Sequence, residues 1–376
     1  MSIVQYNFPT IIKYGNKAAK MAPLILAEKG CERPMIITDR PVSQLSFLKE
    51  IKASLEDAGL ITEIYADFQG NPIRQHVMNG AEKCREYGAD ALVIVGGGAA
   101  LDVGKAIALM LNHPGDVFDY EDGNPDSLPI DQPFPFMIAI PTTAGTGSEV
   151  GRSSVISEDQ SKKKRIIFDP KMLPNIVLAD PELTVGLPAA ITAATGFDAL
   201  THNIEAYLAK GFHPICDGIA LEGVRLIAKN LEKAVKSPLD LEARGAMLMA
   251  SMMGAIAFQK GLGLTHSAAH ALSTVCDTHH GLANALMIES CMKFNQPMVQ
   301  EKFKILEQVV GCEKGTTFLE WLGAFKKKVG LPSGLKEIGV TITDQLIDIA
   351  FDDPCHPSGP KPVTKNDFKT IYQESL

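Results

Sequence analysis

The first half of the chain alternates short apolar runs with amphipathic stretches. Strands are predicted at four apolar runs rich in β-branched residues, 33–40, 61–67, 91–98 and 136–143. The intervening stretches, such as 46–59, repeat apolar residues every three or four positions, which predicts helices. A short run at 177–179 is expected to add a further strand. Strands that alternate with helices indicate a parallel, Rossmann-like sheet with helices on both faces.

After about Pro188 the pattern changes to long helical repeats with hardly a strand among them. A chain of 376 residues is also longer than one ordinary hydrophobic core supports. We therefore predict an α/β dinucleotide-binding domain over residues 1–185 and an all-helical domain over residues 186–376. The stretch 116–131, rich in Asp, Pro and Gly, is expected to be a surface loop.

Composition limits the class of protein. The net charge of −8 argues against a nucleic-acid partner, and the one basic run, 162–165, is short. The seven cysteines are scattered without CxxC spacing, as expected for free thiols in a reducing compartment. No signal peptide is apparent in residues 1–15, and no uninterrupted apolar run reaches the roughly 18 residues of a spanning helix. We expect a cytoplasmic protein with no membrane partner.

Two loops that follow predicted strands indicate a nucleotide site. Gly96, Gly97 and Gly98 lie between a strand and a helix expected to begin near Leu101, where the backbone can approach a phosphate. The second loop, 141–148, is dense in hydroxyls and glycine. Asp39, at the end of another strand, can accept hydrogen bonds from a ribose and repel a 2′-phosphate, which favours NAD over NADP. A surface-turn aspartate would fit the same pattern.

Five of the nine histidines gather in two segments of the helical half. Asp198 and His202 are four residues apart, as are His266 and His270, and His279 and His280 follow. Residues at this spacing share one helix face, so each pair can direct two donors at one point. A carboxylate with neutral imidazoles suits Fe(II), Zn(II) or Ni(II). Spacing alone does not choose between His266 and His270, or between His279 and His280.

Five motifs together closely resemble the iron-containing (group III) alcohol dehydrogenase family. They are GGGAALDVGK (96–105), PTTAGTGSE (141–149), DP (180–181), TAATGFDALTHNIEAY (192–207) and HSAAHALSTVCDTHHG (266–281). The similarity extends from FPTIIKYG near the N-terminus to the last predicted helices. It implies the dehydroquinate synthase-like architecture of that family, with the active site in a cleft between the two domains.

The resemblance also implies site residues. The metal ligands would be Asp198, His202, His266 and His280, and His270 would be a catalytic residue that relays a proton near the nicotinamide. The cofactor contacts carried over from the family are Asp39, Asn71, Gly97, Gly98, Asp102, Thr142, Thr143, Lys164 and Leu183.

Three positions depart from the family pattern. Ala99 replaces the usual serine after the three glycines, which removes a hydroxyl from the pyrophosphate site. His279 stands where a proline is usual and would add an imidazole near the metal. Residues 356–361 replace a segment that resembles Asn-Pro-Arg in the family.

The resemblance implies an NAD-dependent alcohol dehydrogenase or aldehyde reductase that uses Fe(II), or alternatively Zn or Ni, on a small alcohol or aldehyde, as a homodimer. The metal would polarise the substrate oxygen for hydride transfer. One alternative is a glycerol dehydrogenase-like zinc polyol dehydrogenase. A second is a dehydroquinate synthase-like lyase, which would need several Lys and Arg beside the metal, and the metal-bearing segments are short of them. A third is a non-catalytic binding protein that has kept the fold, and the intact ligand set argues against it.

Overall fold

The computed structural model describes residues 8, 10–160 and 163–376. They form two compact units. The α/β unit contains Phe8–Thr143 and Ser148–Thr184, and the helical unit contains Ala144–Gly147 and Val185–Leu376. Most of the N-terminal stretch in which no signal peptide is expected lies outside the described residues, as does Lys162 of the basic run.

The α/β unit contains the predicted parallel sheet. Its six strands lie in the order β1-β8-β5-β4-β2-β3, and every neighbouring pair is parallel. Their bounds are β1 Ile11–Tyr14, β2 Pro34–Ile37, β3 Glu63–Tyr65, β4 Ala91–Gly96, β5 Phe136–Pro141 and β8 Ile176–Ala179. Because all six strands run the same way, their carboxyl ends lie along one edge, where ligands of such sheets bind.

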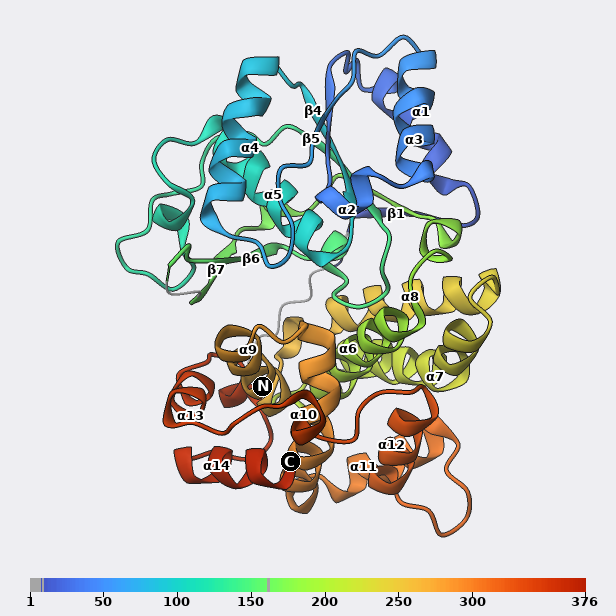
Figure 1. Ribbon diagram of the computed structural model, residues 1–376, viewed down its shortest axis with the longest axis vertical. Coiled ribbons are helices and arrows are strands. Elements are labelled where there is room, and N and C mark those ends of the chain that lie inside the picture. The colour runs from blue at the N-terminus through green and yellow to red at the C-terminus, as the bar shows by residue number, and fades with distance from the viewer. Residues whose placement is uncertain (1–7, 9, 161–162) are drawn as a thin grey trace. The chain divides into compact units, whose positions relative to one another are not determined.

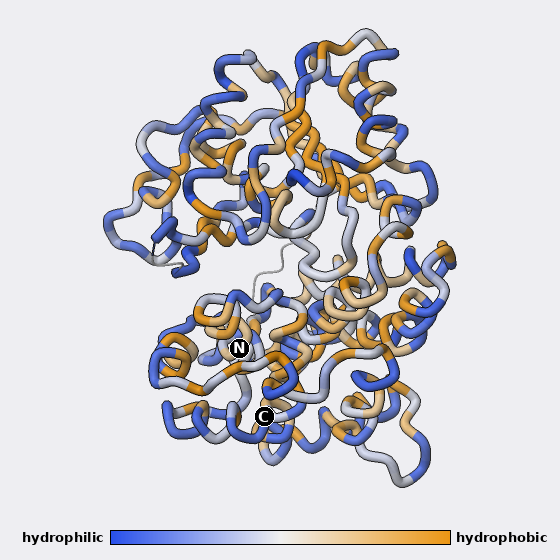
Figure 2. Tube along the Cα trace, viewed as in Figure 1, coloured by the Kyte–Doolittle hydropathy of each residue, from blue (hydrophilic) through white to orange (hydrophobic). Residues whose placement is uncertain are grey.

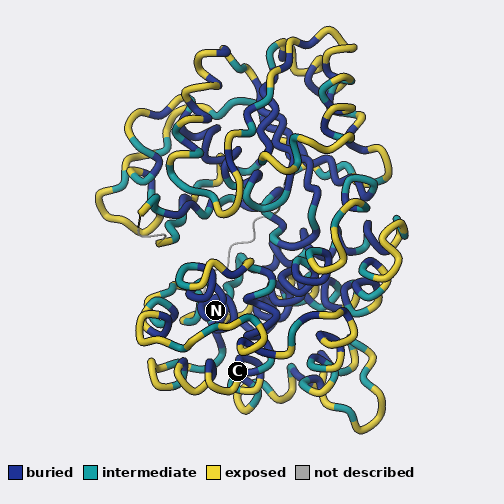
Figure 3. Tube along the Cα trace, in the orientation of Figure 1, coloured by how far each residue is buried: buried dark blue, intermediate teal, exposed yellow. Residues whose placement is uncertain are grey.

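Helices cover both faces of this sheet (Figure 1). On one face, Val93 of β4 joins the core formed with α1 and α3, and on the other Ile94 lies against Gly104 of α5. The central strands are uniformly apolar and buried (Figures 2 and 3), as a sheet covered on both faces requires. The helices are α1 Ala22–Glu28, the short α2 Arg40–Ser43, α3 Ser46–Asp57, α4 Arg74–Tyr87 and α5 Gly98–Asn112.

Three features of this unit differ from the sequence prediction. Helix α5 begins at Gly98 rather than near Leu101, because Gly97 adopts the extended backbone of an N-cap residue. The antiparallel hairpin of β6, Ser153–Ser157, and β7, Lys164–Phe168, was not predicted, since its serines and basic residues weaken the strand pattern. The edge strand β1 was not predicted either, because two of its four residues are exposed and none is buried.

The helical unit contains no strand between residues 185 and 376, all of which the structure describes. Its helices are α6 Ala189–Leu208, α7 Pro214–Lys236, α8 Leu241–Ala257, α9 Leu264–Cys276, α10 His280–Asn295, α11 Gln300–Val310, α12 Phe318–Lys328, α13 Asp344–Phe351 and α14 Lys365–Glu374. Helix α6 is buried along almost its whole length after the first turn and packs against α7, α8 and α10.

The segment Leu241–Lys260, which is α8 and the turn after it, is long and apolar enough to cross a membrane by length and composition. Core helices of other proteins meet the same criterion, and 61% of this segment is buried inside the structure. Since α8 packs against both α6 and α7, it serves here as a core helix of the helical unit.

Two glycines allow α6 to pack closely against its neighbours. A Cβ atom at Gly223 of α7 would lie 2.0 Å from Oδ1 of Asn203, and one at Gly254 of α8 would lie 2.8 Å from Nδ2 of the same residue. The Asn203 amide is fully buried and donates to the carbonyls of Ala199 and Ala250 at 2.8 and 3.0 Å. Close contact across α6 therefore depends on the missing side chains at these positions.

Replacing Gly223 with Ala is expected to destabilise the helical unit by about 1–3 kcal/mol, because Asn203 has no room to move without losing its hydrogen bonds. Gly218→Ala, on the exposed face of the same helix, is the matched control, since nothing lies within 4 Å of a Cβ atom there. It should be neutral or stabilise by up to about 1 kcal/mol through helix propensity. Urea unfolding of both variants tests this contrast, and equal midpoints would refute it.

Candidate metal centre and cofactor loops

The four residues expected as metal ligands come from three helices of the helical unit. Asp198 and His202 occupy one face of α6, one turn apart. His266 lies in the first turn of α9, and His280 is the first residue of α10. One donor atom of each lies within 4.8 Å of the donor atoms of the other three. We call these residues the four-donor cluster.

The Nε2 atoms of the three imidazoles surround one carboxylate oxygen. They lie 3.9 Å (His202), 4.0 Å (His266) and 3.4 Å (His280) from Oδ1 of Asp198. Ligand atoms about 2.0–2.2 Å from a shared metal ion lie about 3.0–3.6 Å from one another. The cluster is therefore slightly wider than a loaded first shell, and small side-chain movements would complete it. One oxygen and three nitrogen donors suit iron or zinc.

Three of the four donors in the cluster are buried, and this burial affects the protonation of His202. Asp198, His202 and His266 are almost fully buried, whereas the His280 side chain is 23% exposed. Burial lowers the pKa of His202 to about 4, with the Asp198 charge opposing the shift. This imidazole is therefore neutral at pH 7, which is the form that binds metals. Among the four donors, His280 has the most exposed side chain.

Glu205 fixes the orientation of His266. This carboxylate lies on α6 and accepts a hydrogen bond from His266 Nδ1 at 2.7 Å. It also accepts the backbone N–H groups of Gly263 and Thr265, at 2.9 and 2.6 Å, at the start of α9. Burial alone would raise the pKa of Glu205, but these hydrogen bonds outweigh it and hold that pKa below its usual value. An ionised Glu205 requires the proton on Nδ1, so the Nε2 lone pair faces the cluster.

Asn284, one turn after His280 on α10, completes the polar surroundings. It is fully buried, and its Nδ2 donates to Oδ1 of Asp198 at 2.8 Å. The same nitrogen lies 3.2 Å from Nε2 of His280 and 3.4 Å from Nε2 of His266. The Asn284 amide therefore places its Nδ2 within 3.4 Å of three of the four donors. In the opposite orientation it would present an oxygen there instead.

His270 lies beside the four-donor cluster with its own carboxylate partner. Its ring centroid is 5.2 Å from that of His280 and 6.0 Å from that of His266. Its Nδ1 lies 2.7 Å from Oδ2 of Asp353, in the segment that follows α13. The His270 side chain is 17% exposed, so it contacts both the cluster and solvent. Its place outside the four donors agrees with the expected role as a proton relay.

His279 does not join the cluster. It is the N-cap residue of α10 and is exposed, whereas the next residue, His280, is directed inward. The structure thus separates two neighbours that spacing could not distinguish, and it does not place the extra imidazole of His279 among the donors.

The Gly96–Gly98 turn meets the first residues of the second loop, 141–143, at the carboxyl edge of the sheet. Gly96 pairs with Pro141 at the ends of β4 and β5, and the N–H of Thr142 donates to the Gly96 carbonyl at 3.0 Å. Gly96 has φ +152°, and a Cβ atom there would lie 2.6 Å from Ala100. A Cβ at Gly97 would lie 3.1 Å from the side chain of Thr143. A side chain at either glycine would be crowded, so the backbone alone forms the turn before α5, as an anion site at a helix N-terminus requires.

Other expected cofactor contacts follow strands of the same sheet. Asp39 comes after β2, Asn71 after β3 and Leu183 after β8, so all three lie towards the carboxyl edge. Asp39 accepts the N–H of Val42 at 2.8 Å as the N-cap of α2. Lys164 begins β7, outside the sheet. These positions all belong to the α/β unit, and their contacts with the cofactor stay predictions.

Asp102 holds the second loop in place. Its carboxylate accepts the Ser148 hydroxyl at 2.5 Å and the N–H of Val155 at 3.0 Å. Lys105, one turn further along α5, is completely buried and donates to the Ser148 carbonyl at 2.9 Å. The Lys105 ammonium also lies 3.5 Å from Asp102. These bonds tie the start of α5 to the loop after β5, so Asp102 has a structural role in addition to the predicted cofactor contact.

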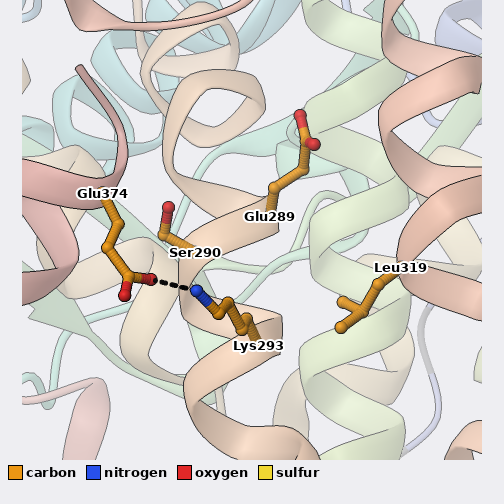
Figure 4. A pocket seen from close by; sticks show the side chains of 5 residues that line it. All are labelled: Glu289, Ser290, Lys293, Leu319 and Glu374. Carbon is orange, nitrogen blue, oxygen red and sulfur yellow. Dashed lines mark hydrogen bonds and ion pairs between the residues drawn. The ribbon is translucent and has the colours of Figure 1, made fainter.

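The helical unit also has a surface pocket of about 340 Å³ that is distinct from the four-donor cluster. Lys293 pairs with Glu374 at 3.1 Å. Figure 4 shows this pair beside Ser290, with Glu289 and Leu319 also lining the pocket. The residues that line it include no histidine or cysteine, so it lacks the donors for transition-metal chemistry.

Sequence reasoning missed three polar residues of the centre. Glu205 follows His202 by three residues, and Asn284 follows His280 by four, so helical spacing from a ligand would have identified both. Asp353 is 83 residues from His270, and no local pattern connects them.

Comparisons with known proteins cover nearly the whole chain. A family model described as iron-containing alcohol dehydrogenase matches residues 9–181, and its C-terminal counterpart matches residues 192–376. The chain is 36% identical to a 4-hydroxybutyrate dehydrogenase of Cupriavidus necator, over 92% of this chain and 93% of that protein. It is 34% identical to an NAD-dependent methanol dehydrogenase of Bacillus methanolicus, over the full length of both. A solved structure of 1,3-propanediol oxidoreductase superposes with a TM-score of 0.94 at 30% identity and covers both chains completely.

The four-donor cluster is expected to fail when one inner donor is removed. His266→Ala should reduce bound metal to a small fraction of that in the unmodified protein, because three remaining donors hold the ion weakly and Glu205 loses its partner. His279→Ala is the matched control and should keep its metal, since it removes an exposed neighbouring imidazole. Metal content measured by plasma emission after dialysis checks both variants. Full metal in His266→Ala, or loss in His279→Ala, would show that the ligand set is wrong.

Proposed function

Because the chain belongs to the iron-containing alcohol dehydrogenase family, we propose that it interconverts a small primary alcohol and its aldehyde, with NAD as hydride carrier and Fe(II) as metal. The observation that carries this proposal is the four-donor cluster, in which one carboxylate and three imidazoles converge inside the helical unit. Three relatives are named for 4-hydroxybutyrate, methanol and 1,3-propanediol, which are all primary alcohols. These names support a short, unbranched substrate.

The donor set fits a divalent metal, and the glycine-containing loops fit a dinucleotide. When bound, the metal acts as a Lewis acid on the substrate oxygen and NAD accepts the hydride. The protein contributes a buried, prearranged set of donors, of which Glu205 fixes one imidazole. The partly exposed side of the cluster at His280 leaves room for the substrate oxygen.

His270 supplies the proton transfer. Burial alone would raise the pKa of Asp353, but the charge and hydrogen bond of His270, with bonds from Cys355 and Ser267, hold that pKa well below its usual range. An ionised Asp353 only accepts hydrogen bonds, so Nδ1 of His270 carries the proton and Nε2 presents a lone pair. Nε2 can then take the proton from the alcohol and pass it to solvent.

We also propose that the protein is a cytoplasmic homodimer. The seven cysteines support the compartment, since all are thiols in the structure and none forms a disulfide. Light scattering on the purified protein would give the mass in solution.

The function is tested by loading the purified protein with Fe(II) without oxygen and following NADH oxidation with a series of short aldehydes. Activity should appear with primary aldehydes, fall after chelation and return with added iron. The same series with NADPH and with ketones provides the controls. If iron-loaded protein oxidises no NADH with any aldehyde, the proposal is wrong.

Asp39 is expected to set the preference for NAD over NADP, because its carboxylate would repel a 2′-phosphate. Asp39→Gly should shift the ratio of kcat/KM for NAD and NADP towards NADP by about tenfold, which corresponds to about 1.4 kcal/mol. Asp39→Asn is a useful second variant, since it removes the charge yet can still cap α2. Equal use of both cofactors by the unmodified protein would contradict this role.

His270→Ala is expected to lower kcat by roughly a hundredfold to ten-thousandfold and to alter its pH profile, while metal content stays unchanged. Asp353→Asn should also lower kcat with full metal content, because it removes the charge that fixes the His270 tautomer. Rate and metal stoichiometry are measured in the same preparation. Loss of metal from His270→Ala would make this residue a ligand, and an unchanged rate would make it a packing residue.

A further inference from the structure

A second cluster of metal-binding side chains lies beside the proton relay. One donor atom each of His270, Asp353 and Cys355 lies within 4.8 Å of the other two. His270 belongs to α9, whereas Asp353 and Cys355 lie in the segment between α13 and the short turn His356–Ser358. That segment directly precedes residues 356–361, where the sequence departs from the family pattern and the proposed function assigns no role.

Hydrogen bonds hold this cluster together. Oδ2 of Asp353 accepts Nδ1 of His270 at 2.7 Å, and Oδ1 accepts the N–H of Cys355 at 2.9 Å. The Ser267 hydroxyl donates to Oδ1 at 2.8 Å and accepts the N–H of His356 at 2.9 Å. The segment is thus fixed against α9 with the cysteine next to the carboxylate.

The cluster is accessible from solvent. The side chains of His270 and Asp353 are 17% and 11% exposed, and Cys355 is of intermediate exposure. A hydrated cation can therefore reach it without unfolding the helical unit. In the four-donor cluster, by contrast, the Asp198 and His266 side chains are only 3% and 1% exposed.

The donor types select the ion. One thiolate, one imidazole and one carboxylate suit Zn²⁺ and related thiophilic ions, whereas Mg²⁺ and Ca²⁺ prefer oxygen alone. Around a tetrahedral zinc the donors would lie about 3.3–3.8 Å apart. The His270 and Asp353 donors would have to separate slightly, and the Cys355 sulfur, on a segment outside the helices, would have to approach them. Three protein ligands leave a fourth position for water, as in reversible sites.

We propose that His270, Asp353 and Cys355 form a second, inhibitory site for a thiophilic divalent cation such as Zn²⁺. On binding, the Cys355 thiol releases its proton to solvent, and zinc replaces the proton on Nδ1 of His270. The displaced proton moves through solvent to Nε2, so the imidazole stays neutral. Nε2 is then a donor and can no longer accept a proton, so the relay stops. The inhibitory effect rests on the proposed function, whereas the binding does not.

The test titrates iron-loaded protein with Zn²⁺, and separately with Cd²⁺, whose thiolate bonds absorb in the ultraviolet. Bound metal, cadmium–thiolate absorption and aldehyde reduction are measured together.

The test variant is Cys355→Ser, and the matched control is Cys276→Ser, which removes the exposed thiol at the end of α9. The unmodified protein and Cys276→Ser should each bind one added ion, show the absorption and lose activity at the same zinc concentration. Cys355→Ser should lack the absorption and, relative to its own rate without zinc, require at least about tenfold more zinc for the same loss of activity.

Two results would overturn the proposal. If Cys355→Ser loses activity at the same zinc concentration with release of iron, zinc acts by displacing iron from the four-donor cluster. If the cadmium–thiolate absorption persists in Cys355→Ser, another cysteine binds the ion. Should no preparation reduce an aldehyde, the proposed function fails, and the absorption in the unmodified protein and its loss in Cys355→Ser still decide whether the site binds.

Discussion

The helical unit depends on one buried carboxylate, because its negative charge needs a compensating positive charge. Asp198 is almost fully buried on α6, and the Nε2 atoms of three imidazoles surround its Oδ1. An isolated charge in such a place costs several kcal/mol, and the His202 imidazole, whose pKa burial lowers to about 4, supplies no opposing charge at pH 7. A divalent cation supplies the opposing charge and links α6, α9 and α10. Metal binding and the stability of the helical core are therefore expected to be coupled.

A carboxylate that accepts the Nδ1 proton of a histidine occurs twice in the helical unit, and the two pairs have different roles. Glu205 and Asp353 each accept the Nδ1 proton of a histidine at 2.7 Å, and each therefore directs an Nε2 lone pair away from itself. His266 is buried, so its lone pair serves a metal. His270 is partly exposed, so its lone pair can exchange protons with solvent. Exposure rather than residue type separates the ligand from the relay.

Much of the architecture could be predicted from periodicity. The parallel sheet and the helical second half followed from apolar patterns, because a strand buried on both faces and a long amphipathic helix leave strong signals. The edge strand β1 and the β6–β7 hairpin left weak ones, since exposed or serine-rich strands lack those patterns. The start of α5 was misplaced by three residues because Gly97 is the N-cap despite having no capping side chain.

The candidate site, like the fold, could be predicted from the sequence only in part. Spacing on one helix indicated the pair on α6, but the choice of His266 over His270 and of His280 over His279 depends on how separate helices pack. Only the resemblance to a family could make that choice from sequence. The partnership of His270 with Asp353 spans 83 residues, so it is a property of the folded chain alone.

The central claim is that one carboxylate oxygen and three imidazole nitrogens hold the metal. X-ray absorption spectroscopy at the iron edge of protein loaded with one equivalent of Fe(II) tests it most directly. The predicted spectrum has nitrogen and oxygen neighbours at about 2.1 Å, with outer-shell scattering from about three imidazole rings and no sulfur. A sulfur neighbour, or scattering from fewer than two imidazoles, would contradict the account.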